Sequence, residues 1–109
     1  MILVSCGFDA HLDDPLASMR VSEQGYRDMA RVVRGLAEDL CSGRVAFVLE
    51  GGYAASGLMA GTRGLLDAML ESPGRLPADP TAPEGSTLRR VLRQVGAVHG
   101  AQYPDLSAA

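Results

Sequence analysis

The strongest constraint on the fold is a pair of short apolar runs on either side of one amphipathic stretch. The first run covers residues 2–6 and stops at Gly7, and the second covers residues 45–49 and stops at Glu50. Both runs are continuous rather than alternating, which predicts strands buried on both faces of a parallel sheet. A strand–helix–strand unit of this spacing has parallel strands and a right-handed crossover.

The amphipathic stretch predicts a helix of about 18 residues, because its apolar residues recur at three- and four-residue steps. Ser22 is a suitable N-cap, and Ser42 with Gly43 ends the helix. The expected inner face consists of Tyr26, Met29, Ala30, Val33, Leu36, Ala37 and Leu40. The mostly charged side expected opposite it consists of Arg27, Arg31, Arg34, Glu38 and Asp39.

Two further helices are expected after the second apolar run. Residues 1–71 would then form a β-α-β-α core, 72–86 a Pro-rich surface loop without periodicity, and 87–109 a terminal helix and tail. Ser86 or Thr87 caps the terminal helix. The expected inner face of the second helix is Leu58, Thr62, Leu65, Leu66 and Met69. In the terminal helix Leu88, Val91, Leu92 and Val95 are expected inward, and Arg89, Arg90 and Arg93 outward on a solvated face.

Composition excludes several classes of function. A net charge of -3 gives no basis for binding nucleic acid or a membrane surface, and no run approaches the ~18 apolar residues of a membrane span. Cys6 and Cys41 form no disulfide framework, which indicates a reducing compartment. Met1 is followed at once by strand residues, so we expect no signal peptide and a cytoplasmic location. All ten basic residues are Arg and Asn is absent, which indicates a GC-rich, bacterial genome.

A sheet made of only the two predicted strands leaves part of their apolar surface uncovered. Two strands and three helices cannot cover both faces, and open apolar edges pair readily with other chains. At 109 residues the chain is one domain at most. We therefore expect the last part of a larger parallel α/β domain. The alternative is a non-catalytic remnant that associates with another chain through its exposed strand edges; the oligomeric state is open.

Polar or flexible residues follow both strands at the edge where α/β sheets bind ligands. Asp9 follows the first strand, whereas Gly51, Gly52 and Tyr53 follow the second. Neighbouring strands lie about 4.8 Å apart, so the two ends can converge on one site. Taken alone, Asp9 could also be a turn or capping residue, and Tyr53 a half-buried packing aromatic.

Together the motifs resemble the histone deacetylase superfamily. The Leu-Glu-Gly-Gly-Tyr form is similar to class II and to the bacterial acetoin-utilisation and acetylpolyamine-amidohydrolase branches. The resemblance covers nearly all of this chain and the carboxyl-terminal third of the family's catalytic domain. It implies an α/β fold of the arginase/deacetylase type, here strand-helix-strand-helix-helix. The motifs are Val4-Ser5-Cys6-Gly7-Phe8-Asp9-Ala10-His11, Asp13-Asp14-Pro15-Leu16 and Leu49-Glu50-Gly51-Gly52-Tyr53.

The resemblance also implies a reaction. Family members hydrolyse acetylamides with one Zn²⁺ held by two Asp and one His, and a Tyr hydroxyl donates to the developing oxyanion. Carried over, Asp9 is a zinc ligand, Tyr53 is the oxyanion donor, and Leu16 lines the acyl-lysine channel. Gly51 and Gly52 keep the backbone close to the substrate. That substrate is acetyl-lysine in a protein, an acetylpolyamine or another small acetylamide.

The chain departs from the family pattern in what it lacks. It has neither the His-His dyad that handles protons nor the upstream Asp-x-His segment that supplies the other two zinc ligands. Catalytic zinc takes three protein ligands, so we predict no deacetylase activity from these residues alone.

Two polar features beside Asp9 have simpler interpretations than catalysis. His11 imitates the family's Asp-x-His pair, but that pair belongs to an earlier strand, so we interpret His11 as a rim or turn residue. Asp13 and Asp14 could form an acid/base pair, yet their position beside Pro15 favours a turn.

Overall fold

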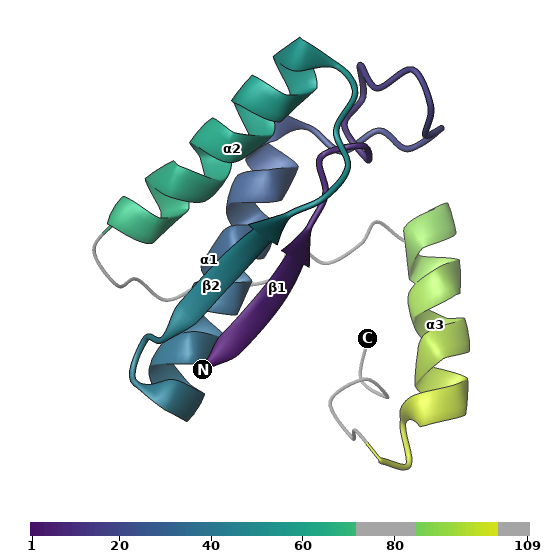
Figure 1. The fold of residues 1–109 in the computed structure, drawn as a ribbon. Coiled ribbons are helices and arrows are strands. Elements are labelled where there is room, and N and C mark those ends of the chain that lie inside the picture. Colours follow the sequence, from purple (N-terminus) through teal and green to yellow (C-terminus); the bar gives the residue numbers. More distant parts are fainter. Residues whose placement is uncertain (72–84, 103–109) are drawn as a thin grey trace. The chain divides into compact units, whose positions relative to one another are not determined.

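The computed structural model describes residues 1–71 and 85–102, and the chain divides into two units, Met1–Leu76 and Pro77–Ala109 (Figure 1). The first unit contains β1 (Ile2–Cys6), α1 (Glu23–Cys41), β2 (Val45–Leu49) and α2 (Ala55–Leu70), and the second contains α3 (Thr87–His99). This order is the predicted one. Most of the predicted Pro-rich loop and the tail from residue 103 lie outside the described residues.

The two strands form a parallel sheet in which Ile2 is paired with Val45 and Cys6 with Leu49. Helix α1 connects them, so the predicted strand–helix–strand unit is confirmed. Both carboxyl ends therefore lie at the same edge of the sheet, which is the arrangement that the site prediction requires.

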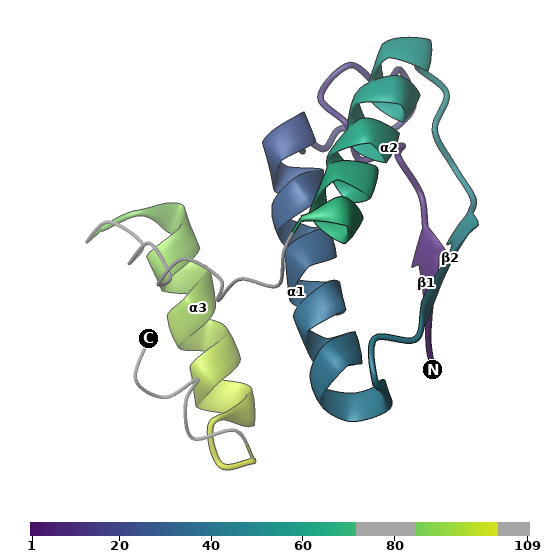
Figure 2. The same cartoon turned by 90° about the vertical axis from the view of Figure 1, so that its left-hand side faces the viewer.

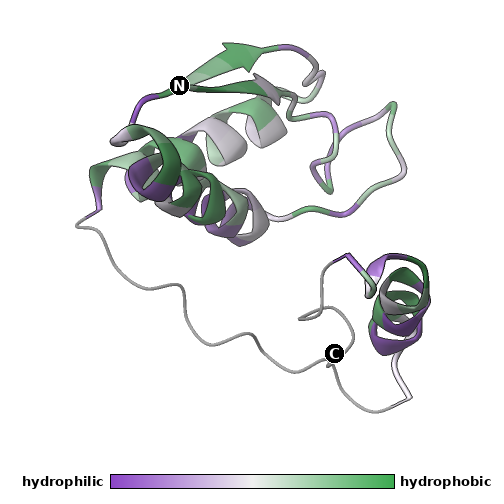
Figure 3. Ribbon diagram, turned by 90° about the horizontal axis from the view of Figure 1, so that it is seen from below, coloured by the Kyte–Doolittle hydropathy of each residue, from purple (hydrophilic) through white to green (hydrophobic). Residues whose placement is uncertain are grey.

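The prediction that both strands are buried on both faces is wrong for this chain. Helices α1 and α2 lie on the same side of the sheet, and within the first unit nothing described covers the other side (Figures 2 and 3). Leu3 of β1 is therefore 66% exposed and Val48 of β2 is 57% exposed. Continuous apolar runs are typical of strands that are covered on both faces of a sheet. The described residues provide a layer of helices on one face only.

Helix α1 has the predicted ends. The Ser22 hydroxyl accepts a hydrogen bond from the Gly25 amide at 3.2 Å, and Ser42 ends the helix in the left-handed conformation at φ 57°. The buried residues of its inner face are Tyr26, Ala30 and Ala37. Other residues predicted for that face, Met29, Leu36 and Leu40, are exposed instead. The described elements cover only part of the apolar stripe.

Three arginines of α1 that were predicted on its outer side face the end of α2 instead. Arg27 and Arg31 both donate to the Glu71 carboxylate, with Nε–Oε distances of 2.9 and 2.8 Å. Arg34 donates to the carbonyl of Ala68 at 2.9 Å and to that of Glu71. Carbonyls in the last turn of a helix lack partners within the helix, so the Arg34 guanidinium satisfies two of them.

The buried face of α2 is a stripe of small residues, not the predicted leucine face. Leu66 is exposed and the other four residues predicted there are only partly buried. The stripe allows α2 to approach its neighbours closely: a Cβ at Gly61 would lie 2.2 Å from the Phe8 ring, and one at Gly64 would lie 2.8 Å from the Glu23 carbonyl of α1. The buried residues of α2 are Gly57, Gly61, Gly64 and Ala68.

Helix α3 begins as predicted, since the Ser86 hydroxyl accepts from the Arg89 amide at 3.2 Å. Its apolar residues are not buried, contrary to the prediction, because nothing described in its own unit packs against them: Leu88 and Val91 are both exposed. Within the described ranges, no helix has the combination of length and apolar character that crossing a membrane requires.

Candidate functional site

The candidate site lies where the tips of β1 and β2 run side by side. Beyond the strands the pairing continues, because the Glu50 amide donates to the Cys6 carbonyl at 3.1 Å and the Phe8 amide donates to the Gly51 carbonyl at 2.7 Å. The Phe8 side chain is buried beneath this junction, against Tyr26 of α1 at a ring-centroid distance of 5.1 Å. A buried aromatic thus anchors the point from which the polar residues emerge.

The Asp9 carboxylate sits in a cradle made by two glycines. A Cβ at Gly7 would lie 2.7 Å from its Oδ1, and a Cβ at Gly51 would lie 2.8 Å from its Cγ. Real Cβ atoms do not approach other atoms so closely, so a side chain at either position would displace the Asp9 carboxylate. Gly52 has a different reason: its φ of 143° is a conformation that other residues rarely adopt. Whether Gly51 and Gly52 also face a substrate stays a prediction.

The segment after Asp9 folds back on itself as a compact turn. The amide of His11 donates to the Phe8 carbonyl at 3.1 Å, and His11 Nδ1 accepts from the Asp13 amide at 3.2 Å. His11 is only 5% exposed and packs against Gly57 of α2. This geometry agrees with its interpretation as a turn residue, since an Nδ1 that accepts a backbone amide is occupied.

Asp14 has a function that the sequence analysis missed. Its side chain is buried, and its Oδ2 accepts from the Tyr53 amide at 2.9 Å across 39 positions of sequence. Its Oδ1 accepts from the amides of Leu16 at 2.9 Å and Ala17 at 3.2 Å. Backbone amides favour the charged carboxylate, so they lower the pKa of Asp14; the largest contribution comes from Tyr53, and Leu16, Ala17 and Ala54 contribute less.

Asp14 escaped prediction because a turn before Pro15 accounts for its sequence context. The bonds to Leu16 and Ala17 belong to such a turn, as expected. The bond to the Tyr53 amide depends on the tertiary arrangement, and no local pattern announces it. The only available signal was that Ala54 cannot cap α2 with its side chain, so the start of that helix needed acceptors from elsewhere.

Tyr26 places a buried hydroxyl under the site. The ring lies between Phe8 and His11, and its oxygen has no hydrogen-bond partner within the described ranges. Burial raises the pKa of Tyr26, and the nearby negative charge of Asp9 raises it further.

Of the four residues predicted to meet a substrate, Tyr53 is 64% and Leu16 71% exposed, whereas Gly51 and Gly52 are half-buried. The structure brings these four residues to one edge of the sheet with Asp9. Asp14 connects Tyr53 to Leu16, because it accepts from the backbone amides of both.

The donor set fits one position of a catalytic zinc site and not the whole site. Asp9 offers a carboxylate in a glycine cradle, but within residues 1–71 and 85–102 no three His, Cys, Asp or Glu side chains come together to hold a metal. A catalytic zinc needs three protein ligands. A catalytic zinc bound by Asp9 would therefore need its other ligands from residues other than the described ones.

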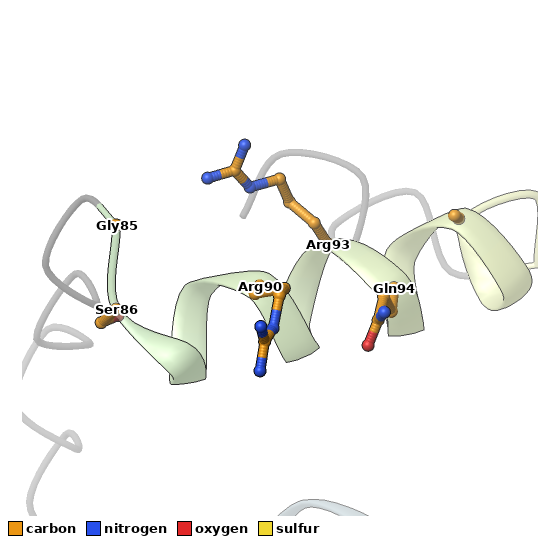
Figure 4. A pocket seen from close by; sticks show the side chains of 6 residues that line it. Gly85, Ser86, Arg90, Arg93 and Gln94 are labelled. Carbon is orange, nitrogen blue, oxygen red and sulfur yellow. The ribbon is translucent and has the colours of Figure 1, made fainter.

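A groove of about 450 Å³ runs along α3 in the second unit, where Arg90 and Gln94 extend to one side and Arg93 to the other (Figure 4). It contains none of the predicted site residues. A second hollow of about 530 Å³ follows the outer face of α2 and is bordered by Leu58, Met59 and Leu66. Neither is the candidate site, which is an open edge of the sheet.

Comparison with known proteins identifies the family to which this site belongs. Residues 1–69 match the family model of the histone deacetylase domain. The chain belongs to the histone deacetylase family. The suspected resemblance is therefore confirmed, and the α/β architecture is that of a piece of a histone deacetylase domain.

Two relatives and one solved structure define how much of a histone deacetylase is present. Type-2 histone deacetylase 1 of Dictyostelium discoideum is 44% identical over 71 residues, which cover 65% of this chain and 5% of the relative. A probable deacetylase of Archaeoglobus fulgidus is 41% identical over 69 residues, or 62% and 19%. The crystal structure of the HDA15 HD domain matches 99% of this chain and 27% of that chain, with a TM-score of 0.69 and 29% identity. The chain thus spans a minor part of each.

Proposed function

We propose that this chain is the carboxyl-terminal segment of a zinc-dependent deacetylase that removes acetyl groups from acetyl-lysine or acetylated small amines. The observation that carries the proposal is the convergence of Asp9 and the Tyr53 segment at one sheet edge, within a chain whose residues 1–69 match the histone deacetylase domain. Its relatives are named as deacetylases. A bacterial source and a cytoplasmic location remain predictions.

In this proposal Asp9, Tyr53 and Leu16 each have a separate role. Asp9 donates one carboxylate ligand to zinc, which when bound polarises the acetyl carbonyl. The Tyr53 hydroxyl donates a hydrogen bond to the oxygen that becomes negative in the transition state. Leu16 forms part of the apolar wall beside the acyl chain. The exposure of Tyr53 and Leu16 agrees with roles that require contact with substrate.

The proposal is tested with Tyr53→Phe in the full-length protein that carries this chain. Loss of one oxyanion donor should lower kcat about 10²- to 10³-fold, because that bond forms only in the transition state. The assay measures acetate release from an acetyl-lysine peptide and from an acetylated polyamine, which also separates the two substrate classes. Zinc content should not change.

The matched control is Tyr26→Phe, which removes the same atom from a hydroxyl without a partner in the described part of the chain. Its kcat should remain within about threefold of the wild type. Full activity of Tyr53→Phe would remove Tyr53 from the proposed role. Assayed alone, the 109-residue chain should release no acetate, since it offers one of three ligands.

The bare side of the sheet favours a second candidate function, association with another chain without catalysis. Leu3 and Val48 are exposed, and both strands have an unpaired edge within the first unit. This candidate requires that the full-length protein release no acetate from either substrate and that the chain bind a partner through this edge. Acetate release that depends on Tyr53 would exclude it.

A further inference from the structure

We propose that Asp14 is a positioning residue that fixes the position of the Tyr53 segment relative to Leu16. This inference rests on the proposed function, because it concerns the residues assigned there to the oxyanion and to the substrate wall. In this inference Asp14 touches neither substrate nor zinc. It acts through Tyr53 and Leu16, which the proposed function assigns to contact with the substrate.

The geometry of the Asp14 carboxylate carries the inference. One oxygen accepts from the Tyr53 amide at 2.9 Å and the other from the Leu16 amide at 2.9 Å, so a single planar group spans both segments. Asp14 is 9% exposed, which protects these bonds from competition with water. Hydrogen bonds to a charged acceptor are also stronger than neutral ones.

Among the described residues, little else restrains the Tyr53 segment on the side that faces Asp14. Residues 51–54 belong to no helix or strand, and Ala54 gives α2 no side-chain cap. The Ser56 hydroxyl donates to Asp13 at 3.1 Å, but this pair is exposed, and Ser56 already lies in the first turn of α2. Asp14 is therefore the buried link between the loop and Tyr53, and a small displacement there moves the hydroxyl that must meet the oxyanion.

Asp14→Asn in the full-length protein tests the inference with little change in shape. The amide has one oxygen and one NH₂ group, and the NH₂ group cannot accept, so at least one of the two segments loses its bond. We expect kcat to fall about 10- to 100-fold, because a misplaced catalytic group loses rate steeply with distance. Asp13→Asn is the matched control and should stay within about threefold, since Asp13 does not contact Tyr53.

The decisive measurement is the same substitution in the Y53F background. If Asp14 acts through the Tyr53 hydroxyl, Asp14→Asn should lower kcat there by less than about threefold, because two residues that act as a unit are not additive. An equal fold-loss in both backgrounds would overturn the inference and leave Asp14 a stabilising residue only. Full activity of Y53F by itself would instead overturn the proposed function.

Unfolding must be separated from misplacement. The thermal midpoint of each variant is measured in parallel, and Asp14→Glu provides a second variant that keeps the charge and both acceptors but shifts them by one methylene. We expect it to show the same dependence on Tyr53, with a smaller loss of kcat. Loss of kcat that follows the unfolded fraction alone, in both variants, would also contradict the inference.

Discussion

The two ends of α2 are held in different ways. Its amino-terminal end lies on the strand tips, where glycines allow contact at van der Waals distance and Asp14 accepts a backbone amide beside it. Its carboxyl-terminal end is held by charge, through Glu71 and three arginines of α1. The site end therefore depends on space and the far end on ion pairs.

The two ends of α2 therefore tolerate different substitutions. A single added methyl group is costly where a Cβ would lie under 3 Å from its neighbour, whereas a lost surface ion pair has a median effect of about 0–1 kcal/mol.

Gly51→Ala should have the largest effect, on activity. The new Cβ would lie 2.8 Å from the Asp9 Cγ and 2.9 Å from its Oδ2, so the carboxylate must move. If Asp9 is the zinc ligand that we propose, its displacement should lower kcat/KM of the full-length protein at least about 10-fold and weaken zinc binding, measured by competition with a chelator. Gly35→Ala is the control, because nothing lies within 4 Å of a Cβ there. Equal behaviour of the two variants would contradict the tight cradle.

Gly61→Ala should have the largest effect on stability. Its Cβ would lie 2.2 Å from Cδ1 of Phe8, the aromatic that anchors the β1 tip. Overpacking of this kind costs about 1–3 kcal/mol, measured by urea unfolding. By contrast, Gly35→Ala should stabilise by about 0.5–1 kcal/mol through helix propensity. A neutral Gly61→Ala would mean that α2 can move away from the sheet without loss.

At the far end, stability should respond to acid through Glu71. Hydrogen bonds from Arg31, and next from Arg27, lower the pKa of Glu71 from 4.5 to about 2. Because the pKa of Glu71 is lower in the folded state, the ionised carboxylate stabilises the fold at pH values above 4.5. This stabilisation is lost as the pH falls from 4.5 to about 2. The pKa of Asp14 is also lowered by backbone hydrogen bonds, first that of Tyr53, so the thermal midpoint is compared between wild type and Glu71→Gln to isolate the contribution of Glu71. The difference between them should shrink over this range; a constant difference would contradict the pairing.

The smallest effect is expected from Tyr26→Phe on stability. The buried hydroxyl makes no hydrogen bond of normal geometry within the described ranges, and the backbone of Ala10 has only a minor effect on it, so its removal relieves a desolvation cost and loses little bonding. The free energy of unfolding should stay equal or rise by less than about 1 kcal/mol. A marked loss of stability would reveal a partner for this oxygen and would connect the site end more tightly to α1.

The sequence predicted the elements and their order because local signals define them. Ser22 and Ser42 end α1 where expected, and both apolar runs became strands. The faces of the helices were harder to predict. Glycine carries no hydrophobic signal, so the buried stripe at Gly57 and Gly61 was invisible beside the leucines. Leu58 and Leu66 marked a face for layers that these residues do not include.

The site was predicted through its motifs and completed only by the tertiary arrangement. The parallel pairing brings Asp9 beside Gly51, as strand order implied, and the family match confirmed the resemblance that singled them out. Contacts across 39 positions, such as that of Asp14 with the Tyr53 amide, have no sequence period to reveal them. Arg27, Arg31 and Arg34 were likewise predicted only on the charged side of the first helix, and their contacts with the end of α2 depend on the tertiary arrangement.

The double attachment of Asp14 limits how this part of the molecule can be re-engineered. A loop that borders a substrate is usually treated as an independent module, open to exchange for new specificity. Here residues 14–17 share one carboxylate with the segment that presents Tyr53, so transplanting either piece alone leaves a buried anion or a buried amide without its counterpart. Successful grafts should exchange both segments as a matched pair.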